Sequence, residues 1–146
     1  MKCPYCRSAD TDVYNTRSTR FQTQIWRRRR CLACYKAFTT YERPDLSFLV
    51  VVNPKGEKTR YSRSTLFSEV YDAFKGIENQ ADVIDAVTDT IEAKVLDLRS
   101  SLTTAHIRAI VLETLKHYDS NAFLRYLASH SQLASPAQLK RELNKY

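Results

Sequence analysis

Glycine is scarce in this chain of 146 residues, which contains only Gly56 and Gly76. Two glycines cannot form the GxGxxG or GxxxxGK[ST] loops that hold phosphate groups, so both of those nucleotide-binding classes are excluded. Long apolar runs are missing as well. The longest, at 48–52, is far shorter than the roughly 18 residues that a membrane-spanning helix needs. No apolar segment precedes Cys3, so we expect no signal peptide and a cytoplasmic protein.

Signatures of catalysis are also missing. The three histidines, His106, His117 and His130, have no neighbouring cysteine or carboxylate pair at a useful spacing, and no HExxH motif occurs. Hydrolytic metal sites and two-metal phosphodiester chemistry need such groups close together. We therefore expect that the protein is not an enzyme and that the histidines lie on helix surfaces.

Positive charge is concentrated near the N-terminus. Residues 1–46 contain ten Lys/Arg and four Asp/Glu, a net charge of +6, whereas the other 100 residues contain 13 and 12, a net charge of +1. An excess of this kind indicates a polyanionic partner such as nucleic acid. A basic surface that serves only solubility is the alternative.

All four cysteines lie in two CxxC motifs with 24 residues between them. Each motif directs two thiolates to one centre, and zinc favours four such soft ligands in a tetrahedron. Because the protein would fill every coordination position, we expect one structural Zn²⁺ per chain rather than a catalytic one. The four predicted ligands are Cys3, Cys6, Cys31 and Cys34.

Other uses of four cysteines fit less well. Two disulfides are disfavoured in a cytoplasmic protein, the spacing differs from that of ferredoxins, and the βαβ context of a thioredoxin-like pair is absent. A segment of about 46 residues also buries too little apolar surface to be stable alone. Metal binding would supply the missing free energy, so we expect this segment to unfold without its ion.

β-Branched and aromatic residues predict three short strands around the metal site. Two lie between the CxxC motifs, near 13–16 and 25–31, and the third follows the second motif at 37–42. Three strands around a four-cysteine metal site form the pattern of a zinc ribbon.

Four consecutive arginines, Arg27 to Arg30, lead into the second CxxC motif. Strand alternation would place Arg27 and Arg29 on one face and Arg28 and Arg30 on the other. Guanidinium groups suit phosphate because they donate paired hydrogen bonds. A solvated edge strand that resists aggregation is the alternative.

Two aromatic residues and a further arginine accompany this run. Trp26 and Tyr14 would either stack on bases or cover the small core of the ribbon. Because the zinc ribbon and the net charge both indicate a nucleic-acid partner, we favour nucleic-acid binding through the four arginines and Arg17.

The rest of the chain predicts one β-hairpin followed by a helical bundle, so the fold class is α+β. The hairpin consists of strands at 46–53 and 57–61 with a turn at Pro54–Gly56. Helices are predicted after a cap at Ser62 or Ser64, at about 82–99, from 103–104, at about 120–130 and from Ser135–Pro136.

Each of the first four helices has an apolar stripe that we expect to form the core. The predicted stripes contain Leu66, Phe67, Val70, Tyr71 and Phe74, then Val83, Val87, Ile91, Val95 and Leu98, then Ile107, Ile110, Val111 and Leu115, and finally Phe123, Leu124 and Leu127.

Three segments strongly resemble the NrdR family of bacterial transcriptional repressors. They are MKCPYC at 1–6, IWRRRRCLAC at 25–34 and FTTYER at 38–43. The resemblance extends over nearly the whole chain. It implies a DNA-binding zinc ribbon at 1–46, an ATP-cone for regulation and oligomerisation at 47–136, and a C-terminal helix or tail at 137–146.

The resemblance also implies a function. The ribbon would bind paired operator boxes in double-stranded DNA upstream of ribonucleotide reductase genes, with the arginines at 27–30 as its DNA-contacting stretch. The protein would act at the bacterial nucleoid. The ATP-cone would bind ATP or dATP and switch the form of a homo-oligomer, so that high dATP permits repression.

The nucleotide motif departs from the family pattern. The family hairpin reads Val-x-Lys-Arg-Asp-Gly, and residues 51–56 read VVNPKG, so Asn53, Pro54 and Lys55 replace two cations and an acid. Thr65 stands where the family has a lysine, and His130 where it has a tyrosine. Lys55 or Lys58 would have to compensate for the missing cations. The candidate nucleotide-binding residues are Val51, Lys55, Lys58, Thr65 and His130.

Three other functions remain open from the residues. The first is a nucleotide-insensitive zinc-ribbon DNA-binding oligomer with a degenerate ATP-cone. The second is an RNA- or DNA-processing factor with a zinc ribbon. The third is a metal-stabilised interaction module.

Overall fold

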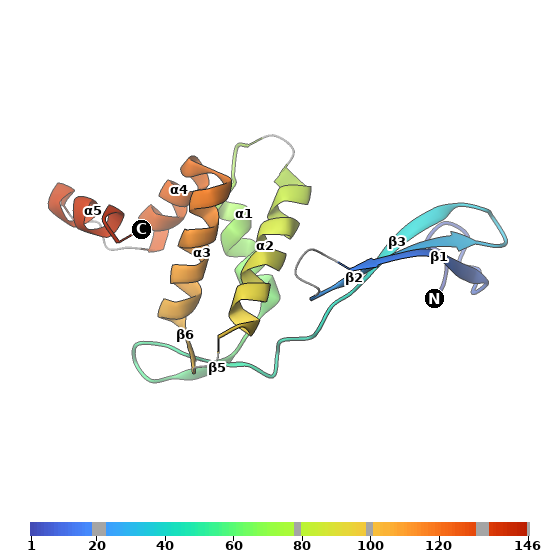
Figure 1. The fold of residues 1–146 in the computed structure, drawn as a ribbon, viewed down its shortest axis with the longest axis horizontal. Coiled ribbons are helices and arrows are strands. Elements are labelled where there is room, and N and C mark those ends of the chain that lie inside the picture. Colours follow the sequence, from blue (N-terminus) through green and yellow to red (C-terminus); the bar gives the residue numbers. More distant parts are fainter. Residues whose placement is uncertain (19–22, 78–79, 99–100, 131–134, 146) are drawn as a thin grey trace. The chain divides into compact units, whose positions relative to one another are not determined.

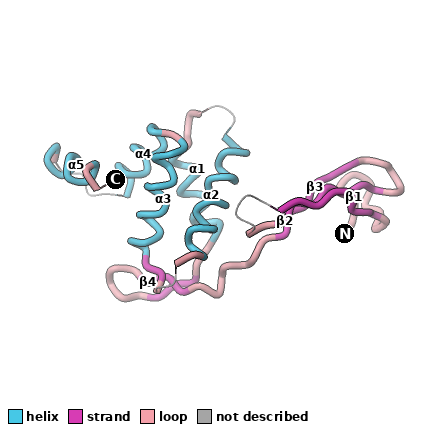
Figure 2. Tube along the Cα trace, viewed as in Figure 1, coloured by secondary structure: helices cyan, strands magenta, loops and turns pink. Residues whose placement is uncertain are grey.

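The computed structural model describes residues 1–18, 23–77, 80–98, 101–130 and 135–145. The chain divides into two compact units, Met1–Asp45, here called the ribbon unit, and Leu46–Tyr146, the C-terminal unit (Figure 1). Among the described residues the ribbon unit contains strands and loops, and every helix lies in the C-terminal unit (Figure 2). No helix in the described ranges is both long and apolar enough to cross a membrane.

Three antiparallel strands form the ribbon unit, as predicted. They are β1 (Thr11–Ser18), β2 (Ile25–Cys31) and β3 (Ala37–Glu42), with β2 in the centre of the sheet. The ladder between β1 and β2 is interrupted at Tyr14, where β1 contains one extra residue. Such a bulge increases the local twist and re-aims the extra side chain.

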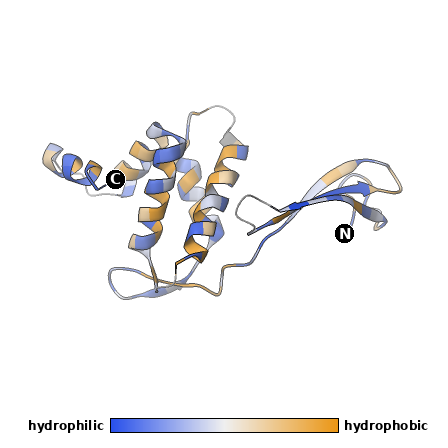
Figure 3. Cartoon of the chain, viewed as in Figure 1, coloured by the Kyte–Doolittle hydropathy of each residue, from blue (hydrophilic) through white to orange (hydrophobic). Residues whose placement is uncertain are grey.

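The core of the ribbon unit is very small. Its described buried cluster consists of Cys3, Cys31 and Phe38, with Cys34 packed against it. Figure 3 shows the contrast with the C-terminal unit, because β2 is mostly hydrophilic while the helices alternate between hydrophobic and hydrophilic segments. Burial of so few side chains does not offset the conformational entropy of ordering a segment of this length.

The C-terminal unit begins with a three-stranded sheet in the order β5-β4-β6. Strands β4 (Val50–Val52) and β5 (Lys58–Arg60) form the predicted hairpin, although β4 is shorter than the apolar run at 46–53. Gly56 takes a positive φ of 82° in the turn. The third strand, β6 (Leu102–Thr103), pairs in parallel with β4 and was not predicted, because two residues show no strand periodicity.

Five helices follow the hairpin. They are α1 (Arg63–Ala73), α2 (Gln80–Leu96), α3 (Thr104–Tyr118), α4 (Ser120–His130) and α5 (Pro136–Leu143). The predicted caps are confirmed at Ser62 and Ser135, and Thr103 caps the helix that was predicted to start at 103–104. Each of these side chains accepts a hydrogen bond from the amide three residues later. Helix α2 runs from Gln80 to Leu96, so the predicted range of about 82–99 starts two residues late and extends past the observed end.

The first four helices enclose the main core. Helix α1 contacts α2 and α4, and α3 contacts the same two helices from the other side. The predicted stripes supply most of the buried cluster, which continues into β4 and β6. Helix α5 has no buried residue among those described.

Three predicted core residues are wrong. Tyr71, Val83 and Leu124 are 47%, 37% and 46% exposed. Each lies beside a buried neighbour, which is Val70 in α1, Ile84 in α2 and Phe123 in α4. Two adjacent apolar residues on a helix point about 100° apart, and only the packing of neighbouring helices decides which one faces inward.

A buried polar cluster joins the start of α1 to α2. Arg63 donates hydrogen bonds to Glu92 and, at 2.6 Å, to Asp89, and the Tyr61 hydroxyl donates to Glu92 at 3.1 Å. Burial acts to lower the pKa of Arg63, but the carboxylates of Glu92 and Asp89 outweigh it and raise that pKa. The guanidinium therefore stays charged and holds the two helices together.

Candidate metal centre, nucleic-acid surface and nucleotide pocket

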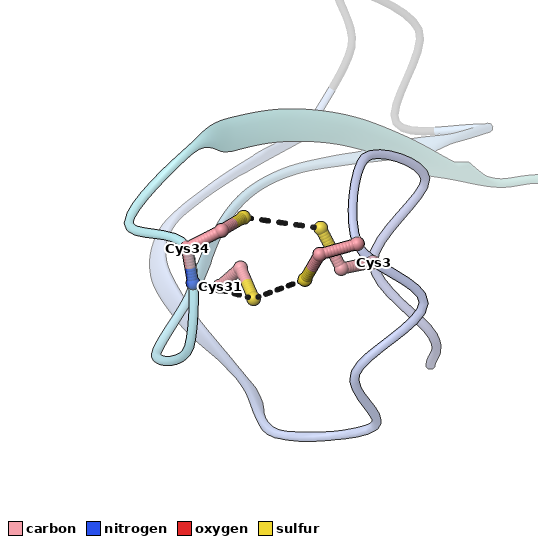
Figure 4. A group of neighbouring side chains, drawn as sticks. Cys3, Cys31 and Cys34 are labelled. Atoms are coloured by element: carbon pink, nitrogen blue, oxygen red, sulfur yellow. Dashed lines mark hydrogen bonds between the residues drawn. The ribbon is translucent and has the colours of Figure 1, made fainter.

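The four cysteine sulfurs converge on one point in the ribbon unit. All four lie within 4.8 Å of one another, with 3.7 Å between Cys3 Sγ and Cys34 Sγ and 3.5 Å between Cys6 Sγ and Cys31 Sγ (Figure 4). A tetrahedral zinc ion with Zn–S bonds of roughly 2.3 Å separates its sulfurs by about 3.8 Å. The sulfur positions therefore fit a four-cysteine zinc site.

The two CxxC motifs have the same backbone geometry. The amide of Arg7 donates to the carbonyl of Cys3 at 2.9 Å, and the amide of Tyr35 donates to the carbonyl of Cys31 at 3.0 Å. Both Arg7 and Tyr35 take left-handed conformations, with φ of 63° and 59°. This turn after each motif was not predicted, because no glycine marks either position.

The thiols of the first CxxC motif have shifted pKa values. Burial acts to raise the pKa of Cys3, but the backbone amides of Cys6 and Tyr5 outweigh it and lower that pKa to about 7. The Ser8 amide acts to lower the pKa of Cys6, whereas the neighbouring thiols raise it to about 12. A metal ion favours thiolates because it neutralises their charge.

The arginines of β2 divide between the two faces of the sheet, as alternation predicts. Arg27 donates to Glu42 at 3.0 Å, and Arg29 donates to Thr40 at 3.2 Å. The pairing of β2 with β3 places both arginines on the same face of the sheet as Cys31, here called the cysteine face. Their guanidinium groups are therefore partly committed to neighbours on β3.

The opposite face is here called the aromatic face. On it Arg28 donates to Thr39 at 2.8 Å and to the hydroxyl of Tyr14 at 3.3 Å. Trp26 pairs with Tyr41 on β3 and with Arg17 on β1. Trp26 and Tyr14 therefore do not cover the core beside Cys31 and Phe38. The aromatic face consists of Tyr14, Arg17, Trp26, Arg28, Arg30, Thr39 and Tyr41.

A pocket of about 490 Å³ opens in the C-terminal unit between β5 and helices α1, α3 and α4. Of the candidate nucleotide-binding residues, Val51, Thr65 and His130 line this pocket. His130 was predicted to lie on a helix surface, and that surface is part of the pocket wall. Lys55 and Lys58 do not line this pocket.

Four residues that the sequence analysis missed supply much of the pocket's chemistry. The rings of Tyr126 and His130 stack with centroids 4.0 Å apart, and the Tyr126 hydroxyl donates to Glu69 at 3.0 Å. Arg60 and Arg108 are the arginines of the lining. They come from β5 and α3, and no sequence signal links these two positions.

The turn between β4 and β5 explains part of the difference between residues 51–56 and the nucleotide motif that the family resemblance implies. The side-chain oxygen of Asn53 accepts hydrogen bonds from the amides of Lys55 and Glu57, each at 2.9 Å. Its side-chain nitrogen donates to the carboxylate of Glu57 at 2.6 Å. Asn53, which stands where the family resemblance implies a lysine, therefore stabilises the turn through these hydrogen bonds.

Comparison with known proteins adds to this geometry. Residues 1–42 match the family described as "Transcriptional repressor NrdR-like, N-terminal domain". Transcriptional repressor NrdR of Leptothrix cholodnii is 35% identical over 133 residues, which is 90% of each chain. That of Polaromonas naphthalenivorans is 37% identical over 86% of this chain and 85% of its own. That of Herminiimonas arsenicoxydans is 32% identical over 96% of this chain and 90% of its own.

The family match and the four-cysteine cluster together support a structural zinc ion in the ribbon unit. The similarity to the repressors also extends well beyond the ribbon, across the helices of the C-terminal unit. The chain therefore belongs to the NrdR family of transcriptional repressors, which are regulators and not enzymes.

Proposed function

We propose that this protein represses ribonucleotide reductase genes by binding paired operator boxes in double-stranded DNA as a homo-oligomer. ATP or dATP in the C-terminal unit controls that oligomer. Membership of the NrdR family supports the repressor role. The observation that carries the proposal is the arginine strand β2, which ends directly in the four-cysteine cluster.

Zinc in this proposal is structural, and its ligands are Cys3, Cys6, Cys31 and Cys34. The two CxxC turns position these thiolates, and the ion joins the chain before β1 to the end of β2. Because Cys31 is the last residue of β2, the metal also determines where the arginines lie. The ion takes no part in chemistry, since protein fills its coordination sphere.

The arginines differ in how free they are to contact DNA. Arg17 and Arg30 are exposed, and within 1–18 and 23–45 they have no ion pair. Arg27 must leave Glu42 before it contacts a phosphate. We assign phosphate contacts first to Arg17 and Arg30, and then to Arg27, Arg28 and Arg29.

Titration of operator DNA at several salt concentrations tests this assignment. Each phosphate contact contributes about 0.9 to the slope of log K against log salt. Replacement of Arg30 by Ala should reduce the slope by about 0.9 and weaken all sequences equally. Lys75→Ala, on an exposed lysine of the C-terminal unit, is the matched control. An unchanged slope in Arg30→Ala and Arg17→Ala would remove these arginines from the interface.

The pocket of the C-terminal unit is our candidate nucleotide site. His130, whose ring stacks on the buried Tyr126, presents an aromatic surface suited to adenine, and Val51 adds an apolar contact. Thr65 lacks the positive charge of the family lysine, so we assign phosphate binding to Arg60 and Arg108 instead of Lys55 or Lys58. Arginine fits phosphate through paired hydrogen bonds.

Calorimetry with ATP and with dATP tests the nucleotide site. We expect Arg60→Ala combined with Arg108→Ala to abolish the heat, whereas Lys55→Ala combined with Lys58→Ala leaves it unchanged. Absence of heat for the unaltered, zinc-loaded protein at high micromolar nucleotide would refute nucleotide control.

A second candidate function rests on the same pocket. The missing cations at Asn53 and Thr65 favour a nucleotide-insensitive DNA-binding oligomer. The size distribution of zinc-loaded protein on operator DNA, with ATP, with dATP and with neither, separates the two. An identical assembly in all three conditions supports the second candidate.

A further inference from the structure

The aromatic face of the ribbon unit is open and unusually rich in rings. Tyr14 and Tyr41 are each 55% exposed, and Trp26 is half-buried between them on the central strand. Strand pairing places Trp26 directly beside Tyr41 on β3 and Arg17 on β1. Aromatic rings on adjacent strands of an open sheet form a surface on which flat groups can stack.

Positive charge is interleaved with these rings. Arg17 lies in the same row as Trp26, and Arg28 lies one row further along β2, where it donates hydrogen bonds to both Tyr14 and Thr39. Arg30 follows in the next row, opposite Asp12, the one carboxylate that strand pairing places on this face within the described residues. The face therefore combines three arginines with one acid.

Arginines can contact the phosphates of a duplex or of a single strand, but the exposed rings suit an unpaired base. In a double helix each base is stacked on both sides, so its π-surface is hidden from a flat sheet. A single strand exposes its bases, and aromatic stacking with a basic track is how proteins hold such strands. A second copy of the same face would bring arginines against arginines, so charge disfavours self-association.

We propose that the aromatic face binds single-stranded nucleic acid. Unpaired bases stack on Tyr14, Trp26 and Tyr41, and neighbouring phosphates contact Arg17, Arg28 and Arg30. This activity goes beyond the duplex operator binding proposed above. It shares Arg17, Arg28 and Arg30 with that function and adds the three rings as a surface for unpaired bases.

Intrinsic fluorescence tests the proposal directly, because Trp26 is the chain's only tryptophan. Zinc-loaded full-length protein is titrated with an oligo-dT strand of about 12 nucleotides, within the usual range of single-strand sites. We expect saturable quenching of Trp26, since a stacked base contacts the indole ring.

Tyrosine variants show whether stacking carries the binding. Tyr14→Ala and Tyr41→Ala should each weaken oligo-dT binding roughly 5- to 150-fold, the range for loss of one stacked base. Tyr41→Phe, which keeps the ring, should bind like the unaltered protein. Tyr71→Ala, at an exposed tyrosine of α1, is the matched control. Stoichiometric zinc in each variant shows that its ribbon is folded.

Arginine variants test the phosphate contacts of the same face. Replacing Arg17, Arg28 and Arg30 by Ala should reduce the salt slope for oligo-dT by about 2, from roughly 0.7 per contact. Arg29→Ala, on the cysteine face, should leave that slope unchanged. A slope equally sensitive to Arg29 would contradict the assignment to one face.

Parallel titrations identify the ligand and separate the two nucleic-acid activities. Ring-dependent binding of oligo-U as well as oligo-dT supports unpaired bases of either RNA or DNA as ligands, and binding of oligo-dT alone supports DNA. The proposal is overturned if neither strand quenches Trp26, or if Tyr14→Ala and Tyr41→Ala both bind normally. Operator duplex binding that persists in either of these cases leaves the proposed repressor function intact. Single-strand binding without operator binding would remove that function and leave this inference.

Discussion

The two units of this protein reach a folded state in different ways. The C-terminal unit has an apolar cluster that extends over β4, β6 and four helices. The ribbon unit has only Cys3, Cys31 and Phe38 at its centre. Burial therefore stabilises the C-terminal unit, whereas we expect the ribbon unit to depend on the zinc ion that its four cysteines would bind. A loss of stability in the ribbon unit should therefore also abolish DNA binding, whereas a loss of stability in the C-terminal unit should leave the ribbon unit folded.

Removal of zinc should have the largest effect and should affect one unit only. Structural zinc contributes on the order of 10 kcal/mol to small ribbons, so chelation should unfold residues 1–45 and abolish DNA binding. Trp26 fluorescence reports the ribbon unit, and helical circular dichroism reports the C-terminal unit. If elemental analysis shows that the metal is gone and Trp26 still has its native emission, the ribbon unit does not depend on zinc and this difference between the two units is refuted.

Truncation of a core side chain should produce the reverse pattern. Ile91→Ala removes a fully buried side chain of α2, and we expect the C-terminal unit to lose roughly 2–5 kcal/mol of unfolding free energy. Zinc content and Trp26 fluorescence should stay unchanged. Leu124→Ala, at a residue 46% exposed, is the matched control in α4. An equal loss in both variants would contradict the assignment of the core.

Loss of the buried carboxylate that holds Arg63 should have a smaller effect. Glu92→Ala leaves the guanidinium without its nearest partner, and we expect a loss of about 2 kcal/mol in denaturant unfolding of the C-terminal unit. Asp85→Ala should have little effect, because Asp85 is exposed and 3.3 Å from Arg63. If both variants behave alike, the cluster is not a structural link between α1 and α2.

Removal of a helix cap should have the smallest effect. Thr103 accepts a hydrogen bond from the His106 amide at the start of α3, so Thr103→Ala should cost about 1 kcal/mol. Thr103→Ser keeps the hydroxyl and should retain most of that stability. Equal thermal unfolding curves for Ala and Ser at this position would show that the cap contributes nothing.

Sequence patterns predicted the ribbon unit more completely than the C-terminal unit. The CxxC spacing, the three strands and the alternation of Arg27 to Arg30 all depend on neighbours a few residues apart. The left-handed turns at Arg7 and Tyr35 were missed, since glycine is the usual marker of that conformation and is absent there.

In the C-terminal unit, prediction was accurate for helices and poor for the pocket. Caps at Ser62, Thr103 and Ser135 are local signals, so the helix starts were found. Arg60 and Arg108 are far apart in the chain and line the same pocket only because the fold brings β5 and α3 to it. No periodicity within one element contains that information.

The amino-acid sequence by itself therefore determined the two CxxC motifs, the basic strand and the capped helix starts, because each depends on the geometry of a few consecutive residues. Only the tertiary structure decided which aromatic rings share a face with which arginines, how β6 pairs with β4, and which cations line the pocket. These features depend on strand register and helix rotation, and both are set by packing between segments that are distant in the chain.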